Sequence, residues 1–354
     1  MKFLHLADVH LGSKIEAKLP QDKTEERKSE IRAAFKNAIE YAAKADIKVV
    51  VLAGDMFDSD RPFKKDKEFF YSVVRNNPNI DFLYLRGNHD VMESYVEEDL
   101  PNLKTFSKEW TSYDYGEIVF TGIEIAPENA VSMYSSLKLD ESKINVVILH
   151  GQKGDTSGKD KVNLLKLKNK NIDYLALGHL HTYMTGRLDE RGIYAYSGCL
   201  EGRGFDETGE KGFTEVEISE IGKAKAVFRP TSIRKIEECE VDVSGAKDAY
   251  EAYKSVRQSV KGNDRDIFRI VLTGEIEFDG DGLKEETERL SEGNFYFVDV
   301  KDKTVRKIDP EKLAGDSTLK GEFIRRVLES DETEEKKSRI ISIGLKALSG
   351  REID

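Results

Sequence analysis

The chain has 354 residues, 38 % of them apolar and 35 % charged, which is enough for two or three globular domains and excludes a membrane-spanning protein. The two cysteines exclude a disulfide framework and, with no apolar signal segment at the N-terminus, predict a cytoplasmic protein. Lysine and arginine number 56 against 67 aspartates and glutamates, and this net charge of −11 excludes a basic nucleic-acid wrapper. A phosphate-bearing ligand would therefore be held locally, by metal ions or a basic patch.

Hydrophobic patterning predicts alternating strands and helices in the first two thirds of the chain. Residues 3–7 and 49–53 are short apolar runs typical of buried strands, and apolar residues at helical spacing predict an amphipathic helix over 22–45. The other predicted elements are a helix over 64–76 and strands over 82–85, 118–123, 146–149, 174–177, 194–197 and 213–218. This order predicts a layered α/β fold, in which a β-sandwich carries helices on its outer faces.

The pattern changes near residue 232, after which no histidine occurs. The predicted elements there are strands over 233–243, 267–273 and 294–300 and helices over 246–260 and 281–291. This β-α-β-α-β order predicts a small α+β domain. Beyond residue 309 the chain is highly charged and reads as two helices separated near 331–333. We therefore expect three parts, covering residues 1–231, 232–309 and 310–354.

Five short polar strings carry the chemistry of the first part, and each follows a run predicted to be a strand. They are Asp8-Val9-His10, Gly54-Asp55-Met56-Phe57-Asp58, Gly87-Asn88-His89-Asp90, His150-Gly151 and Gly178-His179-Leu180-His181. A single string of this kind is usually an ordinary turn, but an ordered set of five that uses nearly all the histidines is unlike a chance pattern. We expect the five to meet at the carboxyl edge of a sheet, where sites in α/β folds form.

Carboxylate, imidazole and amide oxygen are ligands suited to manganese, iron or zinc. A carboxylate can bridge two cations, and two cations about 3.5–4 Å apart can clamp a phosphate and activate a water. Two divalent ions beside the carboxylates of Asp8 and Asp55 would leave about two positive charges, enough to attract a phosphate to an acidic protein.

The five strings resemble the motifs of the calcineurin-like binuclear metallophosphoesterase superfamily, and in particular its SbcD-type DNA-repair nuclease branch. The opening over residues 3–12, the string over 196–205 and the length of chain after the catalytic part point to that branch. The resemblance implies a four-layer α/β-sandwich metallophosphoesterase domain, then a small α+β capping domain and a C-terminal helical segment. It also implies a metal assignment, with one ion on Asp8, His10, Asp55 and His181 and the other on Asp55, Asn88, His150 and His179.

The resemblance makes His89 the residue that contacts the scissile phosphate and protonates the leaving oxygen, a task that suits imidazole near neutral pH. Asp90 is predicted either to orient an imidazole or to cap a turn. Archaeal relatives carry histidine where this chain has Asp58, so the role of that histidine does not transfer. Asp58 is predicted instead to hold His89 or a water on the metal. Manganese is the metal that the resemblance implies, and the ligand types also allow iron or zinc.

The leading hypothesis is a metal-dependent DNA nuclease, with exonuclease and endonuclease activity both open, that acts in DNA repair or recombination. The alternative is a phosphatase or small-molecule phosphodiesterase of the same superfamily, which would have little use for about 120 residues after the catalytic domain. A non-catalytic scaffold is disfavoured because every ligand position and His89 are present. The resemblance suggests a homodimer, although the residues leave the oligomeric state open.

The C-terminal segment carries two amphipathic patterns. Apolar residues recur at helical spacing from Leu319 to Leu328 and again from Ile340 to Leu348. Helices this short are marginal alone, so they must pack on something. They would either pack on their own domain or dock an SbcC-like coiled-coil ATPase, the partner that the resemblance implies.

Overall fold

The structure is a computed structural model that describes residues 1–348 except 16, 18, 60, 91–99, 263, 279 and 308–312. It forms two compact units, Met1–Glu237 with Arg265–Ile267, and Glu238–Asp264 with Phe268–Asp354. The predicted boundaries at residues 231 and 309 stay predictions. None of the helices in the described residues is long and apolar enough to cross a membrane.

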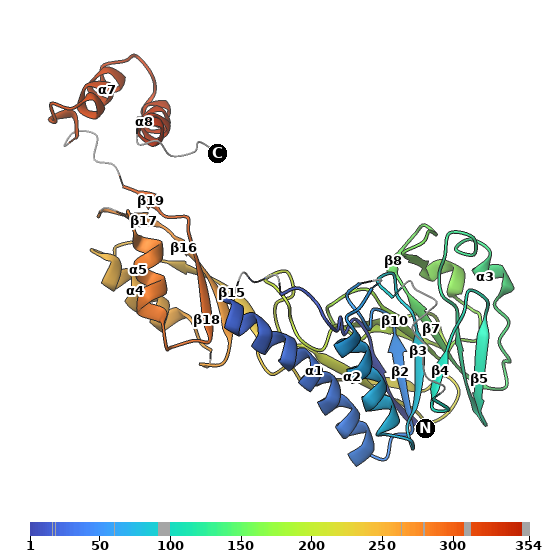
Figure 1. Cartoon of the computed structure of the whole chain (residues 1–354). Helices are drawn as coiled ribbons and strands as arrows, with labels where there is room; N and C mark the ends of the chain where they lie inside the picture. The colour runs from blue at the N-terminus through green and yellow to red at the C-terminus, as the bar shows by residue number, and fades with distance from the viewer. Residues whose placement is uncertain are drawn as a thin grey trace. The chain divides into compact units, whose positions relative to one another are not determined.

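Two six-stranded sheets form the first unit (Figure 1). The first sheet has the order β14-β13-β1-β2-β3-β4 and consists of β1 (Lys2–Leu6), β2 (Val49–Ala53), β3 (Asp81–Leu85), β4 (Leu103–Thr105), β13 (Gly212–Ile218) and β14 (Ala224–Pro230). The second has the order β11-β12-β10-β7-β6-β5 and consists of β5 (Thr111–Tyr115), β6 (Ile118–Gly122), β7 (Ile144–His150), β10 (Tyr174–Gly178), β11 (Met184–Arg187) and β12 (Ile193–Tyr196). The central strands β1, β2 and β3 run parallel, as do β7, β10 and β12.

The main core lies between the two sheets. Alternate residues of β2 divide between two layers, because Val49 and Val51 pack in the cluster shared with the second sheet whereas Val50 and Leu52 pack against the helices. All five residues of β2 are buried, which explains its continuous apolar run.

Helices cover the outer face of the first sheet. α1 (Gln21–Lys44) and α2 (Lys64–Arg75) lie side by side there (Figure 1), and the buried stripe of α1 includes Ile31, Phe35 and Ile39 at helical spacing. The outer face of the second sheet packs on two short helical turns, α3 (Met133–Ser136) and the 3₁₀ turn η2 (Leu164–Leu167). This confirms the predicted four-layer α/β sandwich. A small ribbon of β8 (Gln152–Gly154) and β9 (Lys161–Asn163) follows β7.

The second unit contains a three-stranded sheet in the order β15-β16-β18 and the helices α4 and α5. Its elements are β15 (Ile236–Asp242), α4 (Ala249–Ser259), β16 (Ile267–Thr273), β17 (Glu275–Ile276), α5 (Leu283–Ser291), β18 (Phe297–Asp302) and β19 (Val305–Arg306). The predicted β-α-β-α-β order is confirmed, and β17 pairs with β19 in an additional short ribbon that was not predicted.

Two C-terminal helices, α7 (Leu319–Leu328) and α8 (Glu334–Leu348), form a pair with a small apolar cluster of its own. Ile324, Val327 and Ile341 are buried in this cluster. Leu319, Ile340 and other apolar side chains of the two helices remain exposed. The predicted pair of amphipathic helices is therefore confirmed, and part of its apolar surface is uncovered in the structure.

Candidate metal centre

The predicted site residues gather at the carboxyl ends of the parallel strands of both sheets. The residues that follow the first sheet's strands are Asp8 and His10 after β1, Asp55 after β2, and Asn88, His89 and Asp90 after β3. Those contributed by the second sheet are His150, the last residue of β7, and His179 and His181, which follow β10. Because the sheets are stacked face to face, their carboxyl edges bring these side chains together.

An unusual backbone conformation holds these side chains. Among the described residues, seven other than glycine have positive φ, and four of them are Asp8, His10, Asp55 and His179. This region costs about 1–3 kcal/mol for such residues and persists at functional sites where the surroundings enforce it. Backbone hydrogen bonds of 3.0 Å, from Asp8 N–H to the Gly54 carbonyl and from His10 N–H to the Asp55 carbonyl, join the two loops.

One cluster consists of Asp8, His10 and His181, whose candidate ligand atoms lie within 4.8 Å of one another. The Nε2 atoms of His10 and His181 are 3.2 Å apart. The Asp8 carboxylate is fully buried and accepts the backbone N–H of His179 at 2.9 and 3.0 Å.

The second cluster consists of Asp55, His150 and His179, again with ligand atoms within 4.8 Å. Asn88 belongs to it, because its Oδ1 lies 3.0 Å from His150 Nε2 and 3.1 Å from His179 Nδ1. Asp55 Oδ2 is 3.2 Å from His150 Nε2 and 4.0 Å from His10 Nε2. Asp55 thus lies between the two clusters.

One imidazole in each cluster, His150 and His181, has a contact on its far side that favours a cation between the ligands. His150 Nδ1 lies 2.9 Å from the Ala53 carbonyl, which can only accept, so Nδ1 carries the proton and Nε2 presents a lone pair. That lone pair faces the oxygens of Asp55 and Asn88. His181 Nδ1 lies 2.6 Å from Glu207 Oε1 and 3.1 Å from Arg203 Nη2, and the shorter contact favours donation to Glu207. Electron pairs therefore converge in each cluster, and a positive charge at their centre satisfies them.

The pKa values of His150, Asp8 and Asp55 reflect the close approach of imidazoles and carboxylates in the two clusters. Burial alone would lower the pKa of His150, but the Asp55 and Asp8 carboxylates outweigh it and raise that pKa to about 9. Burial raises the pKa of Asp8 to about 6, against the opposing effect of His150. At Asp55 burial again acts to raise the pKa, yet the charge and hydrogen bond of His150 prevail and lower it below its usual range. A proton on His150 thus satisfies the acceptors that a cation would satisfy.

The three residues predicted to assist catalysis have different surroundings. The His89 side chain is exposed, and its ring centroid lies 5.3 Å from that of His10. Asp90 is fully buried and accepts three backbone N–H groups, so the turn-capping alternative describes its contacts. Asp58 Oδ1 lies 3.0 Å from His10 Nδ1 and 2.8 Å from Arg203 Nη1. In this structure Asp58 therefore contacts His10 and Arg203, and its predicted contact with His89 or with a water on the metal stays a prediction.

Sequence reasoning missed Glu207 and Arg203, which contact His181 on the side away from His10. Arg203 lies in the string over 196–205, and Glu207 follows that string by two residues. Glu207 is 2 % exposed. Its contact with His181 forms only in the folded chain, so no local sequence pattern predicts it.

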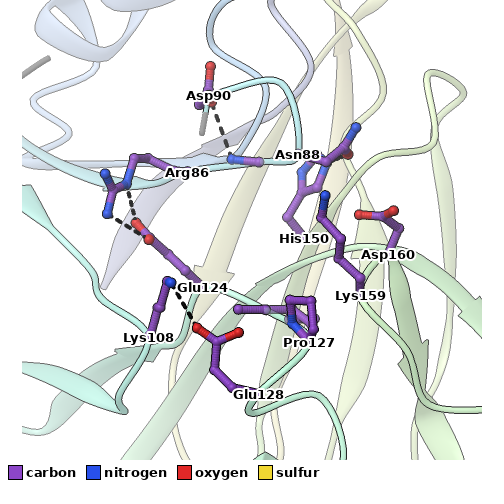
Figure 2. Close-up of a pocket in the computed structure, with 13 residues that line it drawn as sticks. Arg86, Asn88, Asp90, Lys108, Glu124, Pro127, Glu128, His150, Lys159 and Asp160 are labelled. Carbon is purple, nitrogen blue, oxygen red and sulfur yellow. Dashed lines mark hydrogen bonds and ion pairs between the residues drawn. The ribbon is translucent and has the colours of Figure 1, made fainter. Parts of the chain in front are cut away.

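A pocket of about 330 Å³, with several charged residues in its lining, adjoins the second cluster. Figure 2 shows His150 and Asn88 at one end of it and the side chains of Lys159 and Asp160 beside them. Arg86 makes a two-pronged ion pair with Glu124 at 2.6 and 2.7 Å along this pocket. The pocket therefore opens directly onto the candidate ligands.

Comparisons with known proteins agree with this site. The profile of the calcineurin-like phosphoesterase family matches residues 1–183. The chain is 24 % identical to the DNA double-strand break repair protein Mre11 of Sulfurisphaera tokodaii, over 94 % of this chain and 90 % of that protein. It is also 24 % identical to the protein of the same name from Saccharolobus solfataricus, over 87 % of this chain and 84 % of that protein.

Among solved structures, a dimetal phosphatase from Danio rerio matches at a TM-score of 0.43 with 10 % identity, over 64 % of this chain and 95 % of that chain. The family match extends over more than half of this chain and includes the residues of both clusters. The resemblance seen in the sequence is therefore confirmed. The chain belongs to the calcineurin-like phosphoesterase family, whose members hold two divalent metal ions.

Proposed function

We propose that this protein is a metal-dependent DNA nuclease that hydrolyses phosphodiester bonds in DNA repair or recombination. The observation that carries the proposal is the pair of histidine–carboxylate clusters with Asp55 between them. The relatives named DNA double-strand break repair protein Mre11 support the nuclease reading, because this chain spans 90 % and 84 % of their lengths. A cytoplasmic location, which the two-cysteine composition favours, is part of the same proposal.

In this proposal two manganese ions occupy the centre. Their ligands would be Asp8, His10, Asp55 and His181 for one ion and Asp55, Asn88, His150 and His179 for the other. When bound, such a pair lowers the pKa of a water and neutralises the phosphate oxygens. The protein fixes the donor atoms in advance, because hydrogen bonds to the Ala53 carbonyl and to Glu207 set the orientation of two of the rings.

His89 is the proposed general acid. Its backbone N–H donates to Asp55 Oδ1 at 2.9 Å, which anchors the loop at the centre while the ring stays exposed. An imidazole placed beside the ligands but outside them can reach the leaving oxygen of a bound phosphodiester and give it a proton. Asp90 supports this loop because its carboxylate accepts the backbone N–H groups of Met56, Phe57 and Gly87.

The pocket gives substrate a route to the centre. It ends at Asn88 and His150 (Figure 2), and its lining mixes the cations Arg86, Lys108 and Lys159 with the carboxylates of Asp90, Glu124, Glu128 and Asp160. Attraction of a polyanion to this acidic protein would therefore come from the bound metal ions.

The C-terminal helix pair is the proposed docking site for an SbcC-like coiled-coil ATPase. Leu319 is 71 % exposed on α7, and Ile340, Ile343 and Leu348 are 40–42 % exposed on α8. Apolar side chains on short helices are typical of helix-in-groove or helix-on-helix recognition. A homodimer, suggested by the sequence resemblance, stays part of the proposal.

A comparison of substrates tests the proposed function. Manganese-dependent cleavage of linear DNA is measured beside hydrolysis of bis-p-nitrophenyl phosphate and p-nitrophenyl phosphate. A nuclease cleaves the DNA and the diester, and Asp55→Ala abolishes both activities because it removes the shared carboxylate. Asp155→Ala, an exposed carboxylate change, serves as the control and retains activity. Hydrolysis of the monoester alone would instead identify a phosphatase.

A further inference from the structure

Three side chains, Asp58, Arg203 and Glu207, form a contact network between the two histidines of the first cluster. His10 Nδ1 lies 3.0 Å from Asp58 Oδ1 without an aligned hydrogen bond, and Asp58 Oδ1 accepts from Arg203 Nη1 at 2.8 Å. Arg203 donates to Glu207 through Nε at 3.0 Å and through Nη2 at 2.6 Å, and Glu207 Oε1 accepts from His181 Nδ1 at 2.6 Å. The two rings that face each other across the metal position are therefore also linked behind it.

The network favours one nitrogen of the His181 ring as the metal ligand. A carboxylate only accepts, and the 2.6 Å contact of Glu207 Oε1 with His181 Nδ1 is shorter than the 3.1 Å contact of Arg203 Nη2 with the same nitrogen, which favours a proton on Nδ1 and leaves Nε2 as the donor to a metal. Glu207 is 2 % exposed and also accepts the backbone N–H of Arg203 at 2.7 Å. The planar guanidinium holds both carboxylates in fixed directions, which a flexible ammonium would not do.

The second cluster has a different support. His150 is held by the Ala53 carbonyl at 2.9 Å, which is part of the β2 backbone. His179 Nδ1 faces Asn88 Oδ1 directly at 3.1 Å. Arg203 and Glu207 contact neither of these histidines, so the two clusters depend on separate supports.

We propose that Glu207 is a positioning residue which, with Arg203 and Asp58, sets the metal affinity of the Asp8–His10–His181 site separately from that of the other site. The inference rests on the proposed function only in that the clusters bind divalent metal. It adds that the two sites are tuned by different groups, and that loss of the side-chain network yields a protein with one strong and one weak site.

Manganese titration of the full-length protein tests this, with the EPR signal of free Mn²⁺ as the readout. Removal of a carboxylate behind a histidine ligand typically weakens metal binding about 10–100-fold. Glu207→Ala should weaken one of the two sites by that factor and leave the other unchanged. Glu207→Gln should restore part of the loss, because its amide oxygen still accepts from His181 Nδ1. In a His10→Ala background the weakened site should be absent and the strong site unaltered.

A control variant separates positioning from general stability. Arg191 makes a two-pronged ion pair with buried Asp173, at 3.1 and 2.8 Å, at the opposite end of β10 from the site. Arg191→Ala should lower the melting temperature without changing either manganese affinity. A double-mutant cycle adds a further readout, since Asp58→Ala and Glu207→Ala should combine non-additively through the shared Arg203.

The outcomes distinguish this inference from the proposed function. If the wild type binds two manganese ions and cleaves DNA but Glu207→Ala leaves both affinities unchanged, or weakens both equally, the positioning role is wrong and the nuclease remains. If the wild type binds no divalent metal, both are wrong. If Glu207→Ala does not fold, the comparison between Glu207→Gln and the wild type decides, because a site-selective loss supports the role and unchanged affinities overturn it.

Discussion

His89 and Asp90 are neighbours in the chain, yet they have opposite environments. The imidazole of His89 is exposed, whereas the Asp90 carboxylate is fully buried. Burial raises the pKa of Asp90 to about 6, and the charge of Asp55 adds to this, while three backbone N–H groups oppose the rise. Asp90 therefore organises the loops after β2 and β3, and His89 is the one of the two whose side chain is exposed.

Replacement of His89 tests its role directly. His89→Ala should lower DNA cleavage by about 10²–10⁴-fold, because a positioned general acid contributes that much. Manganese stoichiometry should stay at the wild-type value, since the His89 side chain lies outside both ligand sets. Cleavage rates and metal content are measured on the same preparation. Wild-type cleavage by the variant would contradict the assignment.

Glycines at the strand ends allow the two sheets to approach each other at the site. A Cβ on Gly178, the last residue of β10, would lie 2.0 Å from the Ala53 carbonyl and 2.7 Å from His150 Nδ1. A Cβ on Gly87 would lie 2.1 Å from Asp55 Oδ1. The close approach of β2 and β10 therefore depends on the absence of these side chains.

Gly178→Ala should disrupt the second cluster. The added methyl group must push away the Ala53 carbonyl that holds His150, and overpacking of this kind typically costs about 1–3 kcal/mol of stability. Manganese titration should show loss or weakening of one site, together with a lower melting temperature. Gly154→Ala is the matched control, because nothing lies within 4 Å of its Cβ position. Equal behaviour of the two variants would show that the close approach is unimportant.

The proposed docking surface on the C-terminal helix pair can be tested by substitution. In the full-length chain, Leu319→Glu combined with Ile343→Glu should abolish co-purification with the SbcC-like ATPase, because charge is placed on the exposed apolar surface of α7 and α8. DNA cleavage by the protein alone should be unchanged.

The control for this experiment is Leu165→Glu, which changes a leucine that is 60 % exposed in the first unit. It should leave co-purification intact. Binding of the ATPase with full affinity to the doubly substituted protein would mean that the two helices pack on their own domain and do not dock the ATPase.

At the scale of the molecule, an acidic protein concentrates its metal-binding groups in one of two units. The net charge is −11, and all the residues of the two clusters lie in Met1–Glu237. Metal binding and folding of that unit are therefore linked, because a ligand that binds only the native state stabilises it.

Chelation should destabilise the first unit selectively. At free manganese about 100 times the dissociation constant, each site contributes about 2.7 kcal/mol to the free energy of unfolding. Differential scanning calorimetry with manganese and with EDTA should show a shift in the transition of the first unit alone. Asp55→Ala should abolish the difference. A shift that persists in this variant would show that manganese acts elsewhere.

The sequence by itself determined the central strands and the candidate ligands that the structure brings together. Eight predicted strands correspond to β1, β2, β3, β6, β7, β10, β12 and β13, and the clearest of them, such as β2 and β10, are apolar runs because a strand buried on both faces is apolar along its length. The four strands of the two large sheets that were missed, β4, β5, β11 and β14, are the edges of those sheets. Their residues are mostly half-buried or exposed, so their sequences lack a continuous apolar run.

Only the tertiary structure decided which groups support the ligands. The five strings placed Asp55 and His150 in the site, because chemistry restricts the residue types that bind metal and phosphate. The hydrogen-bond partners of the imidazoles, such as Glu207 and the Ala53 carbonyl, are far along the chain from the histidines that they contact. No short sequence motif therefore identifies them. Asp58 shows the same limit, since its link to His10 follows from packing at the strand ends. Ligand identity is a property of residue type, whereas ligand orientation is a property of the fold.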